Sequence, residues 1–173
     1  MPTLGSDVTK IIGTQHEQVK QALRDVAESS GEERAHAFHR LRLLVALHET
    51  GEEVAVHPQV IARSNGHVGN DRVTEEHEAA STFGELEGLD LDSDEFADGF
   101  AELADDIRSH AQAEEDNEWP LVVKLDEPDV VDHMARVMGS VPALVDEASA
   151  PGADVSFDNM LSWAQSKLTG SPS

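Results

Sequence analysis

The chain has 173 residues and an acidic composition, with 12 Lys and Arg against 35 Asp and Glu and a formal net charge of -23. This excess of negative charge excludes nucleic acids and anionic membrane surfaces as partners, and no stretch approaches the ~20 apolar residues that span a bilayer. There is no cysteine, which excludes disulfides, thiolate zinc sites and iron–sulfur clusters, so any metal must be held by nitrogen and oxygen ligands.

Apolar residues recur with the spacing of helices, and no segment shows the alternation of a strand. The pattern predicts helices over residues 7–28, 32–63, 71–87 and 93–118, and more weakly over 126–148 and 157–168. Ser6 and Ser93 are the expected N-caps of the first and fourth helices. Pro58 is expected to kink the second helix, and Trp119-Pro120 to end or kink the fourth.

The four strong helices predict an all-α fold, an up-down-up-down four-helix bundle with a C-terminal helical extension. The extension has a weaker pattern, which Gly139 and Pro142 are expected to interrupt. We therefore expect a bundle domain over residues 1–125 and an extension over residues 126–173 that packs on the bundle and ends in a frayed tail.

Six polar residues interrupt the apolar stripes of the strong helices. They are His16 on the first helix, His48 and Glu52 on the second, His77 on the third, and His110 and Glu114 on the fourth. A helix advances about 100° per residue, so a His and a Glu four positions apart share one face. Each histidine lies near the middle of its helix, so all four meet at a similar depth in an antiparallel bundle. A buried carboxylate without a partner costs several kcal/mol, and a dinuclear cation site satisfies all six groups.

Each feature alone has a common explanation without a metal. A lone histidine on an apolar face is more often a hydrogen-bonded core residue, and His-x-x-x-Glu arises by chance in glutamate-rich helices. The conjunction on four helices favours the metal site. Exposure is expected for His57, which reaches the site only if the kink at Pro58 turns it inward, and His67 reaches it only if its loop folds back. Glu49 and Glu76 are candidates for outer contacts with the ligands.

The order of these residues resembles the haemerythrin-like (HHE cation-binding) domain family over roughly residues 7 to 120. The segment His48-Glu49-Thr50-Gly51-Glu52-Glu53, followed by Pro58, is similar to the family's second-helix pattern. The resemblance implies a four-helix bundle that holds two non-haem iron ions, oxo- or hydroxo-bridged. It also implies that Glu52 and Glu114 bridge the metals and that the four histidines are terminal ligands.

Two positions depart from the oxygen-carrying members of this family. Those proteins have a His-x-x-x-His pair on the third helix, whereas here Val73 stands four residues before His77. Their last motif ends in Asp five residues after the histidine, whereas here the carboxylate is Glu114 at four, with Glu115 at five. A lost nitrogen ligand leaves a coordination position for a small molecule, which favours redox chemistry over reversible oxygen transport.

We therefore expect a non-haem diiron protein that binds and reacts with hydrogen peroxide or dioxygen, with catalase-like decomposition of peroxide. The alternative is a non-catalytic sensor of oxygen, nitric oxide or iron, with residues 126–173 as its output element. A zinc-binding or metal-free helical interaction module is the third hypothesis. The start of the chain lacks the basic and apolar regions of a signal peptide, so a cytoplasmic location is expected.

Overall fold

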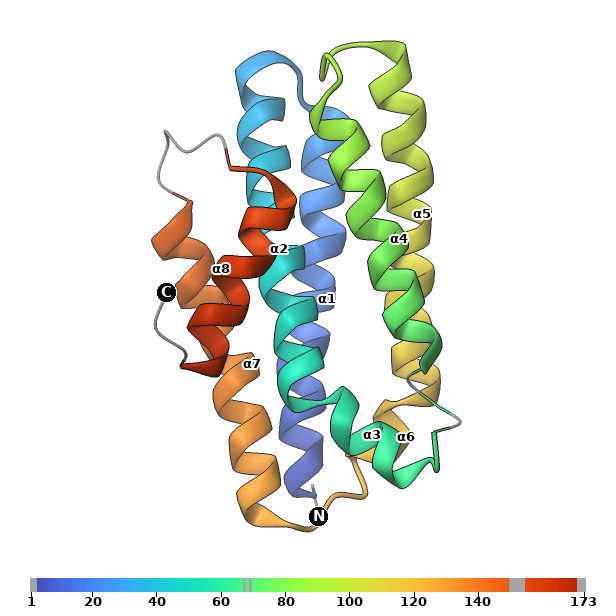
Figure 1. The fold of residues 1–173 in the computed structure, drawn as a ribbon, viewed down its shortest axis with the longest axis vertical. Helices are drawn as coiled ribbons and strands as arrows, with labels where there is room; N and C mark the ends of the chain where they lie inside the picture. The colour runs from blue at the N-terminus through green and yellow to red at the C-terminus, as the bar shows by residue number, and fades with distance from the viewer. Residues whose placement is uncertain (1–2, 67, 69, 150–154, 171–173) are drawn as a thin grey trace.

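The computed structural model describes residues 3–66, 68, 70–149 and 155–170, and within these ranges it contains eight helices and no strand. Four long helices form the bundle: α1 (Leu4–Glu28), α2 (Gly31–Ala55), α4 (Asn70–Glu87) and α5 (Asp94–Asn117). Successive bundle helices run in opposite directions (Figure 1). The predicted all-α bundle is confirmed.

Short helices follow α2 and α5 at the same end of the bundle (Figure 1). They are α3 (His57–Arg63) and α6 (Trp119–Val122). Pro58 and Pro120 lie in the first turns of these helices, where a missing N–H removes no helical hydrogen bond. The kink predicted at Pro58 is therefore present. The chain changes direction between α2 and α3, and again between α5 and α6.

The start of α1 differs from the prediction. Thr3 rather than Ser6 is the N-cap, and the two residues form the reciprocal hydrogen bonds of a capping box. The first turn packs tightly on α6, because a Cβ added to Gly5 would lie only 2.0 Å from the carbonyl oxygen of Val122. Glycine at this position therefore allows α1 to begin beside the corner between α5 and α6.

The C-terminal part consists of α7 (Pro128–Ala148), which packs along α1 and α2, and α8 (Phe157–Thr169), which packs along α2 and α4. The predicted interruptions at Gly139 and Pro142 are wrong, because α7 continues through both. Pro142 is exposed and has no N–H to offer the carbonyl of Met138, four residues earlier. That carbonyl instead accepts a hydrogen bond of 2.7 Å from Gln15 Nε2 on α1. A contact between helices thus replaces the helical bond that proline removes.

Two apolar clusters occupy the interior, one toward each end of the bundle. The upper cluster includes Phe38 and Phe83, and the lower cluster includes Ile12 and Val60. α7 contributes side chains to both clusters and α8 to the upper one. The extension therefore shares the interior of the bundle, while the division into two domains at residue 125 stays a prediction.

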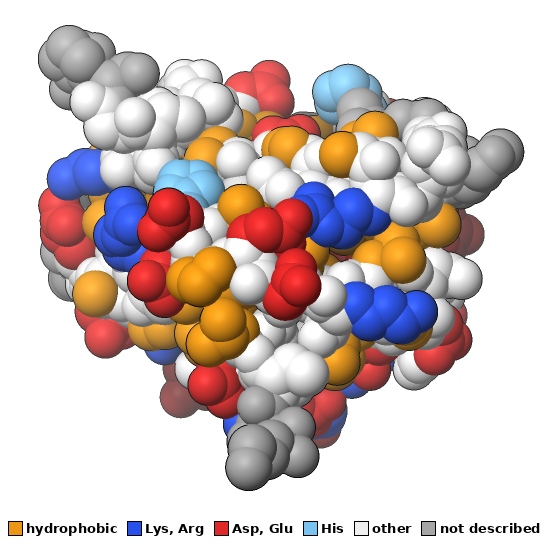
Figure 2. Space-filling model, turned by 90° about the horizontal axis from the view of Figure 1, so that it is seen from below, with side chains coloured by type: hydrophobic (Ala, Val, Ile, Leu, Met, Phe, Trp, Pro, Cys, Tyr) orange, Lys and Arg blue, Asp and Glu red, His pale blue; other side chains and the backbone are white. Residues whose placement is uncertain are grey.

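No helix within the described ranges is both long enough and apolar enough to cross a membrane. Seen from below, the lower end of the bundle carries acidic, basic and apolar side chains next to one another (Figure 2). Side chains of both signs are therefore exposed at this end of the molecule, although the net charge is -23.

Candidate metal centre

The layer between the two apolar clusters is polar and buried. His16, His48 and Glu52 are each 2% exposed, and Glu114 is 1% exposed. His16 Nε2 lies 3.4 Å from Glu114 Oε2, and His48 Nε2 lies 3.5 Å from Glu52 Oε2. The facing atoms of these four residues all lie within 4.8 Å of one another. The structure thus brings together two imidazoles and two carboxylates from α1, α2 and α5, a donor set that can hold a metal ion.

A hydrogen bond at Nδ1, the ring nitrogen that faces away from Glu52, fixes the orientation of His48. Gln15, which is 1% exposed, has its Nε2 engaged by the Met138 carbonyl, so its Oε1 accepts from His48 Nδ1 at 2.9 Å. With the proton on Nδ1, the lone pair of Nε2 faces Glu52. The Met138 carbonyl on α7 therefore fixes Gln15, and Gln15 in turn orients His48 on α2.

His16 is held in the same way by a carboxylate. Its Nδ1 lies 2.9 Å from Glu115 Oε1. The ring of Trp119, at the corner between α5 and α6, stacks on the ring of His16 with 5.8 Å between centroids and 22° between planes. Nε2 of His16 is thereby directed at Glu114.

A second group adjoins the first on the side of α3. His57 Nε2 lies 3.5 Å from Glu114 Oε1 and 3.6 Å from Glu118 Oε2, and all three residues are buried. Their facing atoms also lie within 4.8 Å of one another. The expectation that His57 is exposed is wrong, because the break after Ala55 turns the first residue of α3 toward the bundle axis.

Two carboxylates lie between the groups. Glu114 belongs to both, because Oε2 faces His16 while Oε1 faces His57. Glu52 Oε2 lies 3.5 Å from His48 Nε2 and 3.9 Å from His57 Nε2. This arrangement is compatible with the bridging roles that the resemblance implies for both residues.

The two shared carboxylates have opposite pKa shifts. Burial, together with the charge of Glu114, raises the pKa of Glu52 well above its usual value. Burial also raises the pKa of Glu114, but His110, His16 and His57 outweigh it and hold that pKa well below the usual value. In the absence of a cation, protons on Glu52 and on His16, His57 and His110, whose pKa values are raised, compensate the buried negative charge. Bound cations would displace those protons.

The residues present fit a metal centre. Several buried atoms that point into the layer have no hydrogen-bond partner: His16 Nε2, His57 Nε2, Glu52 Oε2 and both carboxylate oxygens of Glu114. Polar atoms removed from water without partners are costly, and these converge from four helical segments. Imidazole nitrogen and carboxylate oxygen together suit iron and manganese.

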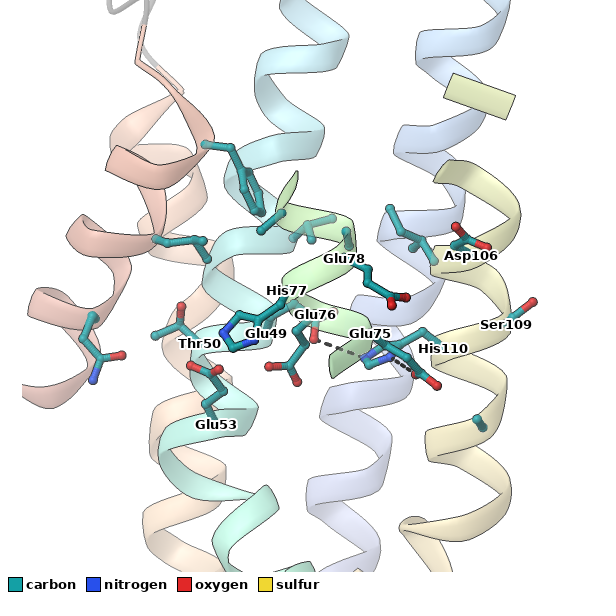
Figure 3. A pocket seen from close by; sticks show the side chains of 18 residues that line it. Glu49, Thr50, Glu53, Glu75, Glu76, His77, Glu78, Asp106, Ser109 and His110 are labelled. Atoms are coloured by element: carbon teal, nitrogen blue, oxygen red, sulfur yellow. Dashed lines mark hydrogen bonds and ion pairs between the residues drawn. The ribbon is translucent and has the colours of Figure 1, made fainter. Parts of the chain in front are cut away.

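His110 lies at the outer edge of the layer, where α5 faces α2 and α4 (Figure 3). Its Nε2 is 3.0 Å from Glu114 Oε1 and 3.2 Å from Glu49 Oε2, and its Nδ1 is 2.7 Å from Glu75 Oε2. Glu49, Glu76 and His110 form a third group whose facing atoms lie within 4.8 Å. His110 therefore connects the buried groups to a more open, acidic region.

The structure does not bring His77 into these groups; it lines the neighbouring cavity, and its role as a metal ligand stays a prediction. His77 is exposed on α4, whereas the side chain of Glu76, one residue earlier, is 8% exposed and lies 3.4 Å from His57 Nδ1 through Oε1. One residue corresponds to about 100° of rotation, so packing has turned Glu76 rather than His77 toward the centre. The four rings around Glu52 and Glu114 come from His16, His48, His57 and His110. His67 and the side chain of Val73 lie outside the described part of the chain.

A repeated segment could have drawn attention to His57 and Glu118. The segments 48–58 and 110–120 both follow His-x-x-x-Glu-Glu-x-x-x-x-Pro. The proline marks the change of direction after a helix that carries candidate ligands. His57 lies one residue before Pro58, and Glu118 lies two residues before Pro120. A polar residue at such a corner is a candidate ligand because the turn can direct it at the bundle axis.

Comparison with known proteins identifies the family. No curated protein and no solved structure gives a significant match. A family model described as Hemerythrin HHE cation binding domain matches residues 7–122, from the first turns of α1 to the end of α6. The matched range covers most of the chain and contains the buried His and Glu groups that could hold metal. The chain belongs to the hemerythrin HHE cation-binding domain family, whose fold implies metal binding, typically of iron.

Proposed function

We propose that the chain holds a dinuclear non-haem iron centre and decomposes hydrogen peroxide there. The first metal position is formed by His16, His48 and Glu52, the second by His57 and Glu118, and Glu114 is shared between them. The observation that carries the proposal is the shared carboxylate. Glu114 is almost completely buried, and its two oxygens face two separate groups of donors.

Iron is the metal that the family favours and that the donor set suits. Nitrogen and oxygen ligands alone leave manganese and zinc as competitors, because geometry and availability rather than affinity decide among these metals. The protein ligands also leave coordination positions for a small molecule, and peroxide, dioxygen and nitric oxide are the partners of suitable size.

Peroxide decomposition converts two molecules of hydrogen peroxide into two of water and one of dioxygen, so one peroxide gains two electrons and the other loses two. Bound iron would supply this redox change. Gln15, Glu115 and Glu75 hold the outer nitrogens of three rings, which fixes the direction of each Nε2. The apolar clusters above and below the layer exclude bulk water, and the cavity beside His110 is a path from solvent for a small neutral molecule.

One observation supports the sensing alternative. Phe157, Leu161 and Gln165 of α8 line the same cavity as His110. Oxygen, nitric oxide or iron bound at the centre could therefore alter the packing of α8, and α8 would then be the output element. In this alternative the centre binds its ligand without turnover.

The test is oxygen evolution from the iron-loaded full chain. We expect about two irons per chain and one dioxygen for every two peroxides consumed. His48→Ala should lose iron and activity together, whereas His133→Ala, which removes an exposed histidine of α7, should retain both. Two bound irons without oxygen evolution would favour the sensor, and a chain that takes up no iron would contradict both proposals.

A further inference from the structure

A cavity of about 600 Å³ opens between α2, α4 and α5, with α8 along one side (Figure 3). Its described lining includes six acidic side chains and no Lys or Arg. Apolar side chains such as Val45, Ile107 and Phe157 form part of the wall, so the field of the carboxylates is less screened than on an open surface. The cavity therefore attracts cations, in contrast to the lower end of the bundle, where both signs are mixed.

Three residues at the inner side of this cavity form a compact set of donors. Glu49 comes from α2, Glu76 from α4 and His110 from α5, and their facing atoms lie within 4.8 Å of one another. His110 Nε2 lies 3.2 Å from Glu49 Oε2. Because three helices contribute one residue each, the packing of the bundle creates this arrangement and no single segment does.

Glu76 gives an independent indication of a ligand. Its side chain is only 8% exposed although it lines the cavity, and neither carboxylate oxygen has a hydrogen-bond partner. His57 Nδ1 lies 3.4 Å from its Oε1. A carboxyl group withdrawn from water in this way either keeps a proton or, when ionised, needs a positive charge next to it. The space between Glu49, Glu76 and His110 is where a cation satisfies that need.

We propose that Glu49, Glu76 and His110 form an outer site for a divalent cation, through which the buried centre is loaded. The inference rests on the proposed function, since loading requires the buried centre. Two carboxylates and one imidazole select a metal such as Fe(II) or Mn(II). The path inward is short, because His110 Nε2 lies 3.2 Å from Glu49 Oε2 on one side and 3.0 Å from Glu114 Oε1 on the other. The same ring nitrogen of His110 therefore contacts both the outer site and the shared carboxylate.

The experiment titrates the metal-free full chain with Co(II), which accepts the same ligands and absorbs visible light when bound. Absorbance counts the bound ions. Quenching of tryptophan fluorescence in a Trp163→Phe background, where Trp119 with its ring stacked on His16 is the one fluorophore of this kind, reports arrival at the buried centre. We expect three equivalents for the wild type, the third being the weakest. Glu76→Gln should bind two and quench Trp119 roughly tenfold more slowly. Glu49→Gln should repeat this result.

The matched control is Glu78→Gln, which removes the same charge from an exposed carboxylate of the same cavity. It should keep the third equivalent and the rate of quenching. If the wild type binds only two equivalents, or if Glu76→Gln keeps the third, the outer site is overturned and the buried centre stands. If no Co(II) binds at all, the outer site and the proposed function fall together.

Discussion

The two sides of the polar layer differ in how they meet solvent. On the side of α1 and α2, His16 and His48 are each 2% exposed, and a carboxylate and an amide hold their outer nitrogens. On the side of α4 and α5, the ring of His110 is 10% exposed and adjoins a cavity of about 600 Å³. The closed side therefore suits permanent retention of ions, and the open side suits exchange with solvent.

The difference also shows where the structure is constrained. The closed side is supported from α7 through Met138 and Gln15, and from the α5–α6 corner through Trp119. On the open side, His110 is surrounded by Glu49 and Glu75. Here α4 packs on α5 and α8, while the cavity lies between residues 75–80 of α4 and residues 45–53 of α2. Substitutions on the closed side should alter affinity, whereas substitutions on the open side should alter access.

The largest effect is expected from Glu114→Gln, because this residue joins the two sides. Removing a shared carboxylate should cost both buried ions, a loss greater than the ~10–100-fold that follows from removing a supporting contact. Elemental analysis of the purified variant measures the loss, and circular dichroism confirms that the helices persist. Retention of two ions would exclude Glu114 as a shared ligand.

His57→Ala tests the position that the corner at Pro58 creates. We expect one of two ions to be lost, because His57 Nε2 faces Glu114 and Glu118 in the second group. His77→Ala is the matched comparison, and it should keep both ions because His77 is exposed. The reverse result, with metal lost only from the His77 variant, would restore the ligand set predicted from the sequence.

Gln15→Leu tests the support behind the closed side. The substitution leaves the Met138 carbonyl and His48 Nδ1 without their partner. Metal affinity should fall ~10–100-fold, and the free energy of unfolding of the metal-free chain should fall by about 1–3 kcal/mol. Competition with a chelator and urea denaturation measure these changes. Gln18→Leu, at an exposed position of α1, should change neither quantity.

The smallest effect is a pH dependence of the metal-free chain that originates on the open side. Burial, with the charge of Glu49, raises the pKa of Glu76 to about 10. An unfolded Glu is ionised above pH ~4.3, so between that pH and about 10 the folded chain holds one more proton. Stability should therefore fall by about 1.4 kcal/mol per pH unit from Glu76 as pH rises from 7 to 8.

Other groups act in the same direction over this window. Burial lowers the pKa of His110, but Glu49 and Glu114 outweigh it and raise that pKa above the usual value, so folding also retains this proton. His48, whose pKa burial lowers to about 4, titrates below the window. Urea denaturation with a chelator at pH 7 and 8 measures the slope, and Glu76→Gln should reduce it. Stability that rises with pH would contradict the assignment.

Much of the closed side could be predicted from the sequence. His16, His48, Glu52 and Glu114 interrupt strongly periodic apolar stripes, and the structure brings their facing atoms together. Their convergence could be predicted because an amphipathic helix has one buried face, and the spacing of the apolar residues identifies it. Their role as metal ligands stays a prediction.

The open side could not be predicted in the same way. α4 has a weak apolar stripe, so its spacing predicted His77 as the inward residue, whereas the structure brings Glu76, about 100° away, into the groups. The direction of His57 depends on the corner after Ala55. The continuity of α7 through Pro142 depends on Gln15, which lies 127 positions earlier and supplies the hydrogen bond to Met138.

The amino-acid sequence by itself determined the helices, the bundle, the restriction to nitrogen and oxygen donors, and the residues of the closed side. Tertiary structure decided which face of α4 turns inward, that His57 joins the centre, and that an acidic cavity leads to His110. The physical reason is that local periodicity defines a face only relative to its own helix, whereas the rotation of one helix against another is set by packing between residues far apart in the chain.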